Sequence, residues 1–124
     1  MSDLNTTIDR WFAALNDTDP DGRAAHVAEA FADDGAWVDP PFQGQGHDAI
    51  NALLANVSEH YPGARFRRVS AIDAHHDAVR YGWEMVDADG NVVIAGTDIG
   101  QVAPDGRLQR VSGFFGPLPE HAAA

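Results

Sequence analysis

The chain has no cysteine, no lysine and no long hydrophobic run. Without cysteine it can form no disulfide, and it has no thiolate to act as a nucleophile or metal ligand. All of its basic residues are arginines, 8 of them against 19 acidic residues, so the net charge is −11. This excess of negative charge disfavours contact with phosphate backbones, and we expect no nucleic-acid partner. No apolar run approaches the ~18 residues that span a bilayer, and we expect no membrane partner.

The length and composition predict one domain. The chain has 124 residues, of which 44% are hydrophobic, enough for a single buried core. We expect the domain to span residues 1–118 and a C-terminal tail to span 119–124. The first residues are neither basic nor followed by a hydrophobic signal core, which indicates a cytoplasmic protein.

The first half of the chain predicts three amphipathic helices, because its hydrophobic residues recur at three- and four-residue spacing. They are expected at about residues 4–15, 20–31 and 47–61. Ser2 or Asp3 would cap the first helix, and Asp19 would cap the second. Between the second and third helices, residues 36–39 predict one short strand, which the Pro40-Pro41 pair ends.

From Arg65 onward the hydrophobic period changes to two, which predicts an antiparallel meander. Its strands are expected at about 65–75, 78–87, 91–103 and 107–115. The second strand has one face of large apolar side chains, which should meet the helices: Val79, Tyr81, Trp83 and Met85. The third strand is apolar on both faces, so a second copy of the chain could cover its outer side as a homodimer. Helices followed by strands indicate an α+β fold, with three helices on a curved antiparallel sheet that forms a cone around a ligand site.

Six short segments carry a resemblance through their order and spacing. They are RWFAALN at 10–16, FADDGA at 31–36, VDP at 38–40, GHDAI at 46–50, GTD at 96–98 and SGFFG at 112–116. Together they resemble the signatures of the SnoaL-like polyketide cyclases and the delta-5-3-ketosteroid isomerases, within the nuclear transport factor 2-like superfamily. The resemblance covers nearly the whole chain. It implies the cone-shaped fold, a pocket for a small hydrophobic molecule, and a homodimer.

The resemblance also implies roles for three residues. Asp39 falls where the isomerase family places the carboxylate that moves a proton between two carbons of an enolisable ketone. Asp98 falls where that family keeps a second carboxyl protonated, so that it donates a hydrogen bond to the developing enolate. Trp11 falls where the family has the tyrosine of its oxyanion hole. The chain departs from the family here, because an indole N–H is a weaker acid than a phenol.

The residues themselves support the two carboxyl groups, with alternatives. Strand alternation puts Asp98 on an otherwise apolar face, where a buried carboxyl would have a raised pKa; the alternative is an exposed Asp on the outer face. For Asp39 the alternative is a strand-ending residue fixed by Pro40. Gly96 and Gly100 flank Asp98 and would leave room for a ligand, or else would serve a bend in the sheet.

Several hydrophobic side chains are candidate walls of the ligand site, with ordinary core packing as the alternative. They are Trp11, Leu54, Tyr81, Trp83 and Phe115. The histidines do not predict a metal site, because His75 and His76 would point to opposite faces of a strand and no His-x-x-x-His pair occurs. We expect no metal and no other cofactor.

Two functions of different classes remain open. The first is a proton-transfer enzyme, an isomerase or aldol-type cyclase, in which Asp39 removes a proton next to a carbonyl and Asp98 stabilises the enolate. The second is a non-catalytic protein that binds a small hydrophobic molecule. Epoxide hydrolysis, a third chemistry found on this fold, uses an Asp-Arg-Asp arrangement. It is disfavoured, because Gly82 rather than a carboxylate stands two positions after Arg80.

Overall fold

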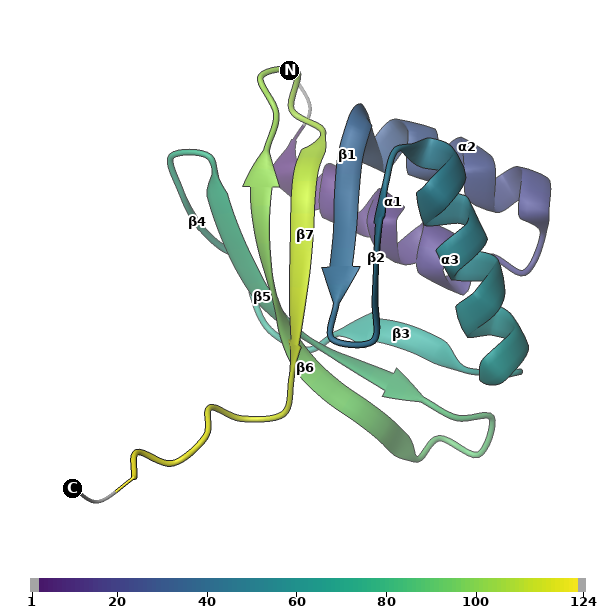
Figure 1. Ribbon diagram of the computed structural model, residues 1–124, viewed down its shortest axis with the longest axis vertical. Coiled ribbons are helices and arrows are strands. Elements are labelled where there is room, and N and C mark those ends of the chain that lie inside the picture. Colours follow the sequence, from purple (N-terminus) through teal and green to yellow (C-terminus); the bar gives the residue numbers. More distant parts are fainter. Residues whose placement is uncertain (1–2, 123–124) are drawn as a thin grey trace.

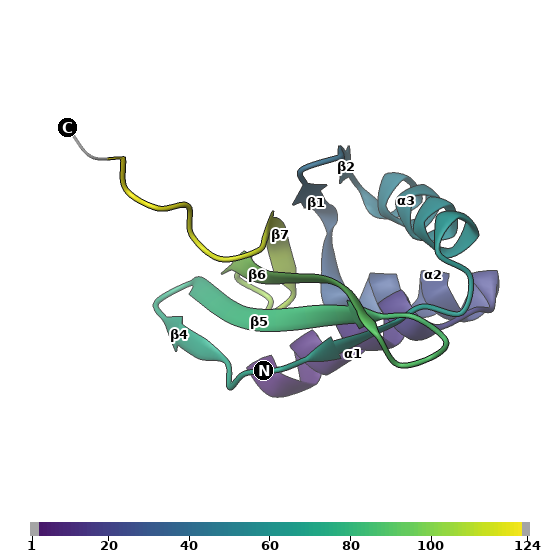
Figure 2. The same cartoon turned by 90° about the horizontal axis from the view of Figure 1, so that it is seen from below.

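Three helices pack on one face of an open, curved sheet in the computed structural model, which describes residues 3–122 (Figures 1 and 2). The helices are α1 (Leu4–Asn16), α2 (Pro20–Ala30) and α3 (His47–His60). Asp3 caps α1, accepting a hydrogen bond from the backbone of Asn5, and Asp19 caps α2. Ser2, the other candidate cap, lies outside the described residues. The predicted α+β cone with three helices is confirmed.

The sheet has seven strands and is mixed. They are β1 (Phe31–Asp39), β2 (Phe42–Gln45), β3 (Arg65–Arg68), β4 (Asp73–His75), β5 (Ala78–Val86), β6 (Val92–Val102) and β7 (Leu108–Phe115). Their order is β2-β1-β7-β6-β5-β3, with β4 beside β5. Strands β5, β6 and β7 form the predicted antiparallel meander, whereas β1 lies parallel to β7. The expectation of an entirely antiparallel sheet is therefore wrong at this one pair, whose strands are far apart in the sequence.

Three element boundaries differ from the prediction. Phe31 begins β1 instead of ending α2, and residues 33–35 lie where the register between β1 and β7 is interrupted. Asp33, Asp34 and Gly35 thus lie at an irregularity within the strand. A second strand, β2, follows Pro40-Pro41 and folds back on β1, where the sequence predicted only one strand between the second and third helices. The expected strand 65–75 is two strands, both paired with β5.

The core lies between the helices and the sheet, and it includes side chains of β1, β5 and β7. All four β5 side chains predicted to face inward are buried there: Val79, Tyr81, Trp83 and Met85. The amphipathic pattern predicted for α2, carried by Ala24, Val27 and Ala28, is only partly right. Val27 is buried as expected, but Ala24 and Ala28 are exposed, and Arg23 and Ala30 face the core. The small side chains of this helix give it a weak apolar face, so tertiary packing decides how it is rotated.

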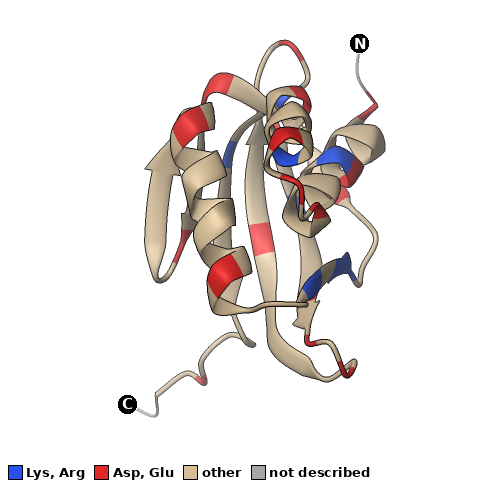
Figure 3. Cartoon of the chain, turned by 90° about the vertical axis from the view of Figure 1, so that its right-hand side faces the viewer, with Lys and Arg blue, Asp and Glu red and all other residues tan. Residues whose placement is uncertain are grey.

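Most charged residues and the C-terminus lie outside this core; Arg23 and Asp98 are the buried charged residues among those described. Acidic residues are spread over the helices and loops (Figure 3). Residues 116–122 leave the end of β7 and extend away from the body (Figure 1). The expected tail, residues 119–124, begins within this extension. Its last two residues lie outside the described residues. No helix within residues 3–122 is long and apolar enough to cross a membrane.

Candidate active site

One row of residues crosses four neighbouring strands and brings two carboxyl groups together. Asp98 on β6 lies opposite Tyr81 on β5 and opposite Gly113 on β7. The parallel register of β1 and β7 brings Asp39 alongside Gly113 from the other direction. The order across the sheet is therefore Asp39, Gly113, Asp98, Tyr81.

Gly113 provides the space in which the two carboxyl groups meet. A Cβ at this position would overlap Oδ1 of Asp39 and would lie 3.1 Å from Oδ1 of Asp98. Both carboxyl oxygens thus border the same point above the Gly113 Cα. Sequence reasoning did not assign this role to Gly113, although a glycine inside a strand is a signal of such a close approach.

The prediction that Gly96 and Gly100 leave room for a ligand is wrong. A Cβ at Gly96 would lie 2.7 Å from the indole of Trp83, and one at Gly100 would lie 2.7 Å from a methyl group of Val79. Large side chains of β5 already fill both positions. These glycines serve packing within the sheet.

The protein environment raises the pKa of both carboxyl groups. Asp98 is 6% exposed, and the Tyr81 hydroxyl donates a 2.8 Å hydrogen bond to its Oδ2. Burial raises the pKa of Asp98 to about 7, against the lowering effect of the Tyr81 hydrogen bond and with a smaller raising effect from the Asp39 charge. Burial raises the pKa of Asp39 to about 6. Near neutral pH the pair can therefore hold one ionised and one protonated carboxyl.

The carboxyl pair borders a small cavity of about 20 Å³, here called the inner pocket. Its walls include Trp11, Trp37, Trp83, Asp39 and Asp98. Two buried polar atoms of these walls, Oδ1 of Asp39 and Nε1 of Trp83, have no hydrogen-bond partner among the described residues. Because an unpaired buried donor and acceptor are costly, the inner pocket is suited to a ligand with a polar group.

The candidate wall residues divide into three groups. Trp11 and Trp83 line the inner pocket, and the Trp11 ring also packs edge-on against Trp37 at 4.9 Å. Tyr81 does not line the inner pocket, and its hydroxyl donates a hydrogen bond to the Asp98 carboxyl group. Leu54 and Phe115 are not brought to the pocket.

Leu54 is a residue of α3 and is buried in the core. Phe115 is 40% exposed at the end of β7, where its ring packs against Trp83. Trp37 is a wall residue that sequence reasoning missed. It stands two positions before Asp39 on β1, so strand alternation puts both side chains on one face, which was the available signal.

The two adjacent histidines do not point apart as expected. Nδ1 of His75 lies 3.1 Å from Nδ1 of His76, because His76 has a φ of 53° in the turn after β4 and not the backbone of a regular strand. Within residues 3–122, no group of three or more His, Asp or Glu side chains is placed to hold a metal ion.

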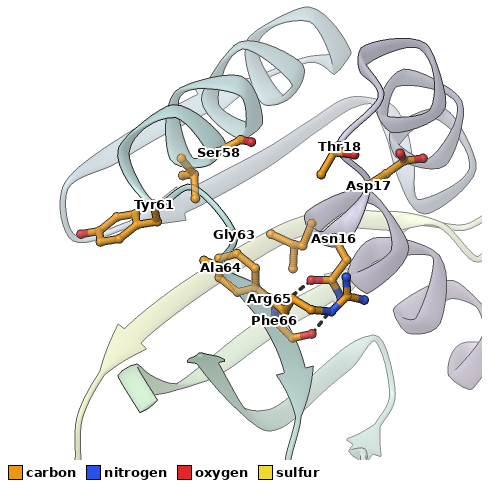
Figure 4. Close-up of a pocket in the computed structure, with 11 residues that line it drawn as sticks. Asn16, Asp17, Thr18, Ser58, Tyr61, Gly63, Ala64, Arg65 and Phe66 are labelled. Atoms are coloured by element: carbon orange, nitrogen blue, oxygen red, sulfur yellow. Dashed lines mark hydrogen bonds between the residues drawn. The ribbon is translucent and has the colours of Figure 1, made fainter. Parts of the chain in front are cut away.

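A second and larger cavity, of about 130 Å³, lies next to the inner pocket and is here called the outer cavity (Figure 4). It is enclosed by the end of α1, the last turns of α3 and the start of β3. Leu15 and Phe66 line both cavities.

The model of the SnoaL-like domain family matches residues 8–111. No curated protein matches the chain in sequence. A SnoaL-like family protein of Agrobacterium tumefaciens, proposed to be an isomerase, is 32% identical with a TM-score of 0.87, and the match covers 94% of this chain and 100% of that one.

Two further solved structures share the fold at lower identity. An NTF2-like protein of an Exiguobacterium species is 21% identical over 90% of this chain and 99% of that one, with a TM-score of 0.72. A protein of Sinorhizobium meliloti, proposed to be a polyketide cyclase, is 19% identical over 88% of this chain and 94% of that one, with a TM-score of 0.70. The expected nuclear transport factor 2-like architecture is thus confirmed.

Proposed function

Because the chain belongs to the SnoaL-like domain family, we propose that its inner pocket binds a small hydrophobic ketone and moves a proton within it, as an isomerase or cyclase does. The observation that carries this proposal is the row of Asp39, Gly113 and Asp98, in which two buried carboxyl groups with raised pKa values border one space. The proposed isomerase activity of the 32% identical Agrobacterium protein is consistent with it.

In this mechanism Asp39 is the base. Its ionised carboxylate takes a proton from the carbon next to the ketone, and the electron pair of the broken C–H bond forms the enolate. Asp98 is the electrophile. Tyr81 donates to Oδ2 of Asp98, so a proton held on Oδ1 faces the space above Gly113 and can donate a hydrogen bond to the enolate oxygen. Asp39 then returns its proton to another carbon of the conjugated enolate. In a cyclase the enolate carbon instead attacks a second carbonyl group, whose π electrons move to its oxygen, and this oxygen takes the proton from Asp39.

The test is proton exchange in a panel of enolisable ketones. Cyclohex-3-enone and androst-5-ene-3,17-dione are incubated with the protein in D₂O, and loss of α-protons is followed by NMR while conjugation is followed by absorbance. We expect exchange with wild type and a loss of about 10²- to 10⁴-fold in Asp39→Asn, the range of general-base catalysis. The control Asp89→Asn removes an exposed carboxyl and should keep full activity.

Two results would change the proposal. Binding of the ketones without exchange, equal in wild type and Asp39→Asn, would favour the alternative function, a non-catalytic protein that binds a small hydrophobic molecule. Absence of both binding and exchange would contradict the proposed ligand class.

We also propose that the protein is a homodimer formed through the outer face of β6 and β7. Val93, Ile99 and Phe114 are 46%, 43% and 60% exposed on this face, which is unusual for large apolar side chains on neighbouring strands. A symmetric interface would bury the same patch on both copies. Light scattering at micromolar concentration should give twice the monomer mass, and Ile99→Asp should halve it. Gln43→Asp, on the edge strand β2, should leave it unchanged.

A further inference from the structure

The inner pocket as it stands is too small for the ligand proposed above. A volume of about 20 Å³ has room for about one water molecule. The outer cavity of about 130 Å³ adjoins it and is separated from it by the side chains of Leu15 and Phe66. A ligand that reaches Asp39 and Asp98 therefore has a direct path through the outer cavity, provided that these two side chains move.

Of the two separating side chains, Phe66 is anchored through its backbone and not through its ring. Phe66 is held at its backbone by Asn16, which accepts a 2.7 Å hydrogen bond from the Phe66 N–H and donates one of 2.8 Å to the Phe66 carbonyl (Figure 4). This reciprocal pair ties β3 to the end of α1. The Phe66 ring is half-buried and lies tilted against Trp83, 6.2 Å between centroids. Rotation of the ring would join the cavities while β3 stays in place.

The outer cavity differs chemically from the inner pocket. Three hydroxyl residues line it, of which Thr18 and Ser58 lie on opposite sides and Tyr61 is the third, and Asp17 and Arg65 contribute one negative and one positive group (Figure 4). The balanced charge gives no preference for an ion, and the net charge of −11 repels anions. Hydroxyl side chains both donate and accept hydrogen bonds, so they suit an uncharged oxygen-bearing group.

We propose that the two cavities are compartments of one binding site, and that the outer cavity binds an uncharged hydroxyl or carbonyl group at the far end of the ligand. This inference rests on the proposed function, because the ketone end of that ligand lies at Asp39 and Asp98. Nε1 of Trp83 and Oδ1 of Asp39, which have no hydrogen-bond partner among the described residues, are polar atoms that the ketone end would meet in the inner pocket. The ligand class is thus an elongated ketone with a second, neutral oxygen function.

Three fluorescent naphthols test this inference, with the naphthol oxygen as a mimic of the enolate. They are 2-naphthol, 6-(hydroxymethyl)-2-naphthol and 6-hydroxy-2-naphthoate. We expect the hydroxymethyl compound to bind about tenfold more tightly than 2-naphthol, the value of one or two net hydrogen bonds, and the carboxylate to gain nothing. The double variant Thr18→Val/Ser58→Ala should remove the tenfold difference without changing 2-naphthol binding. A matched control, Thr6→Val/Asn56→Ala, alters exposed residues that line neither cavity.

Phe66→Ala tests the partition between the compartments. Removing the ring should raise the association rate of all three naphthols by about tenfold, because the joined state no longer has to be reached by ring rotation. Phe42→Ala is the control, since this half-buried ring packs against Trp37 but lines neither cavity. Equal rates in the two variants would contradict the partition.

The outcomes separate this inference from the proposed function. If 2-naphthol binds with a pH dependence that Asp98→Asn abolishes, but the hydroxymethyl group and the double variant change nothing, the outer compartment is wrong and the proposed function stands. If no naphthol binds wild type or Phe66→Ala, both proposals fail. A hydroxymethyl preference that survives in the double variant would mean that Thr18 and Ser58 do not bind this group, and it would also overturn the inference.

Discussion

Replacing Asp98 with asparagine should stabilise the protein at alkaline pH and change little at acid pH. Asp98 is 6% exposed, and burial raises the pKa of its carboxyl from the ordinary 3.8 to about 7. Asparagine has nearly the same shape, and its amide oxygen can still accept the hydrogen bond of Tyr81. The substitution therefore removes the buried charge and leaves the packing intact.

The direction in which pH changes the free energy of unfolding follows from proton binding. Between about pH 4 and pH 7 the folded chain keeps a proton on Asp98 that the unfolded chain has released, so the free energy of unfolding falls as pH rises through this window. A difference of about three pKa units corresponds to about 4 kcal/mol above pH 7. Asp39 titrates beside Asp98, so the shift belongs partly to the pair and about 4 kcal/mol is an upper bound.

The assay is urea unfolding, followed by tryptophan fluorescence, of wild type and Asp98→Asn at about pH 4 and pH 8. We expect the variant to gain about 2 to 4 kcal/mol relative to wild type between the two pH values, or about 10 °C in thermal midpoint. Part of any gain could come from lowering the net charge of −11. Asp89→Asn, in the exposed turn between β5 and β6, removes the same charge without removing burial.

The comparison of these two variants tests whether burial keeps the Asp98 carboxyl protonated. If Asp98→Asn gains no more than Asp89→Asn between the two pH values, the Asp98 carboxyl is not held in its neutral form by burial. The electrophilic role proposed for Asp98 would then lose its physical basis, because an ionised carboxylate cannot donate a hydrogen bond to an enolate.

Three further predictions concern the residues around this carboxyl. Gly113→Ala should displace the Asp39 side chain and abolish ketone proton exchange. It should also lower the free energy of unfolding, measured in urea, by about 1 to 3 kcal/mol. Unchanged exchange would contradict the space above Gly113 that Asp39 and Asp98 are proposed to share. Trp11→Tyr should raise conjugation of androst-5-ene-3,17-dione by about one to three orders of magnitude, the effect of one stronger oxyanion donor; no gain would indicate another substrate. Trp83→Phe removes the unpaired N–H and should weaken 2-naphthol binding about tenfold in a fluorescence titration, whereas an unchanged affinity would mean that no ligand oxygen meets it.

Parts of this fold were predictable from local patterns. The four buried residues of β5 alternate with smaller or polar ones, and that contrast between the two faces fixes which side of the strand meets the helices. The start of β1 was not predictable in this way. Phe31 continues the helical spacing of α2, and only pairing with β7, formed by the far end of the chain, makes it a strand residue.

The candidate site shows the same limit for single residues. Spacing along β6 places Asp98 on the inner face, but it says nothing about Asp39, which reaches the same space through the parallel pairing of β1 with β7. That convergence came from the family resemblance and not from periodicity. Leu54 and Phe115, also candidates, stay outside the pocket, because Leu54 packs into the core from α3 and the Phe115 ring packs against Trp83 at the end of β7.

The glycines show why the free space itself could not be read from the chain. Gly96, Gly100 and Gly113 all lie within strands, and each removes a side chain from its position. What occupies that position depends on the neighbour across the strand. Trp83 and Val79 fill the first two positions, whereas Gly113 has a carboxyl group on each side. Two carboxylates this close repel each other, which favours protonation of one of them. The place of the site is therefore set by pairs of residues on different strands, and one strand's pattern cannot reveal it.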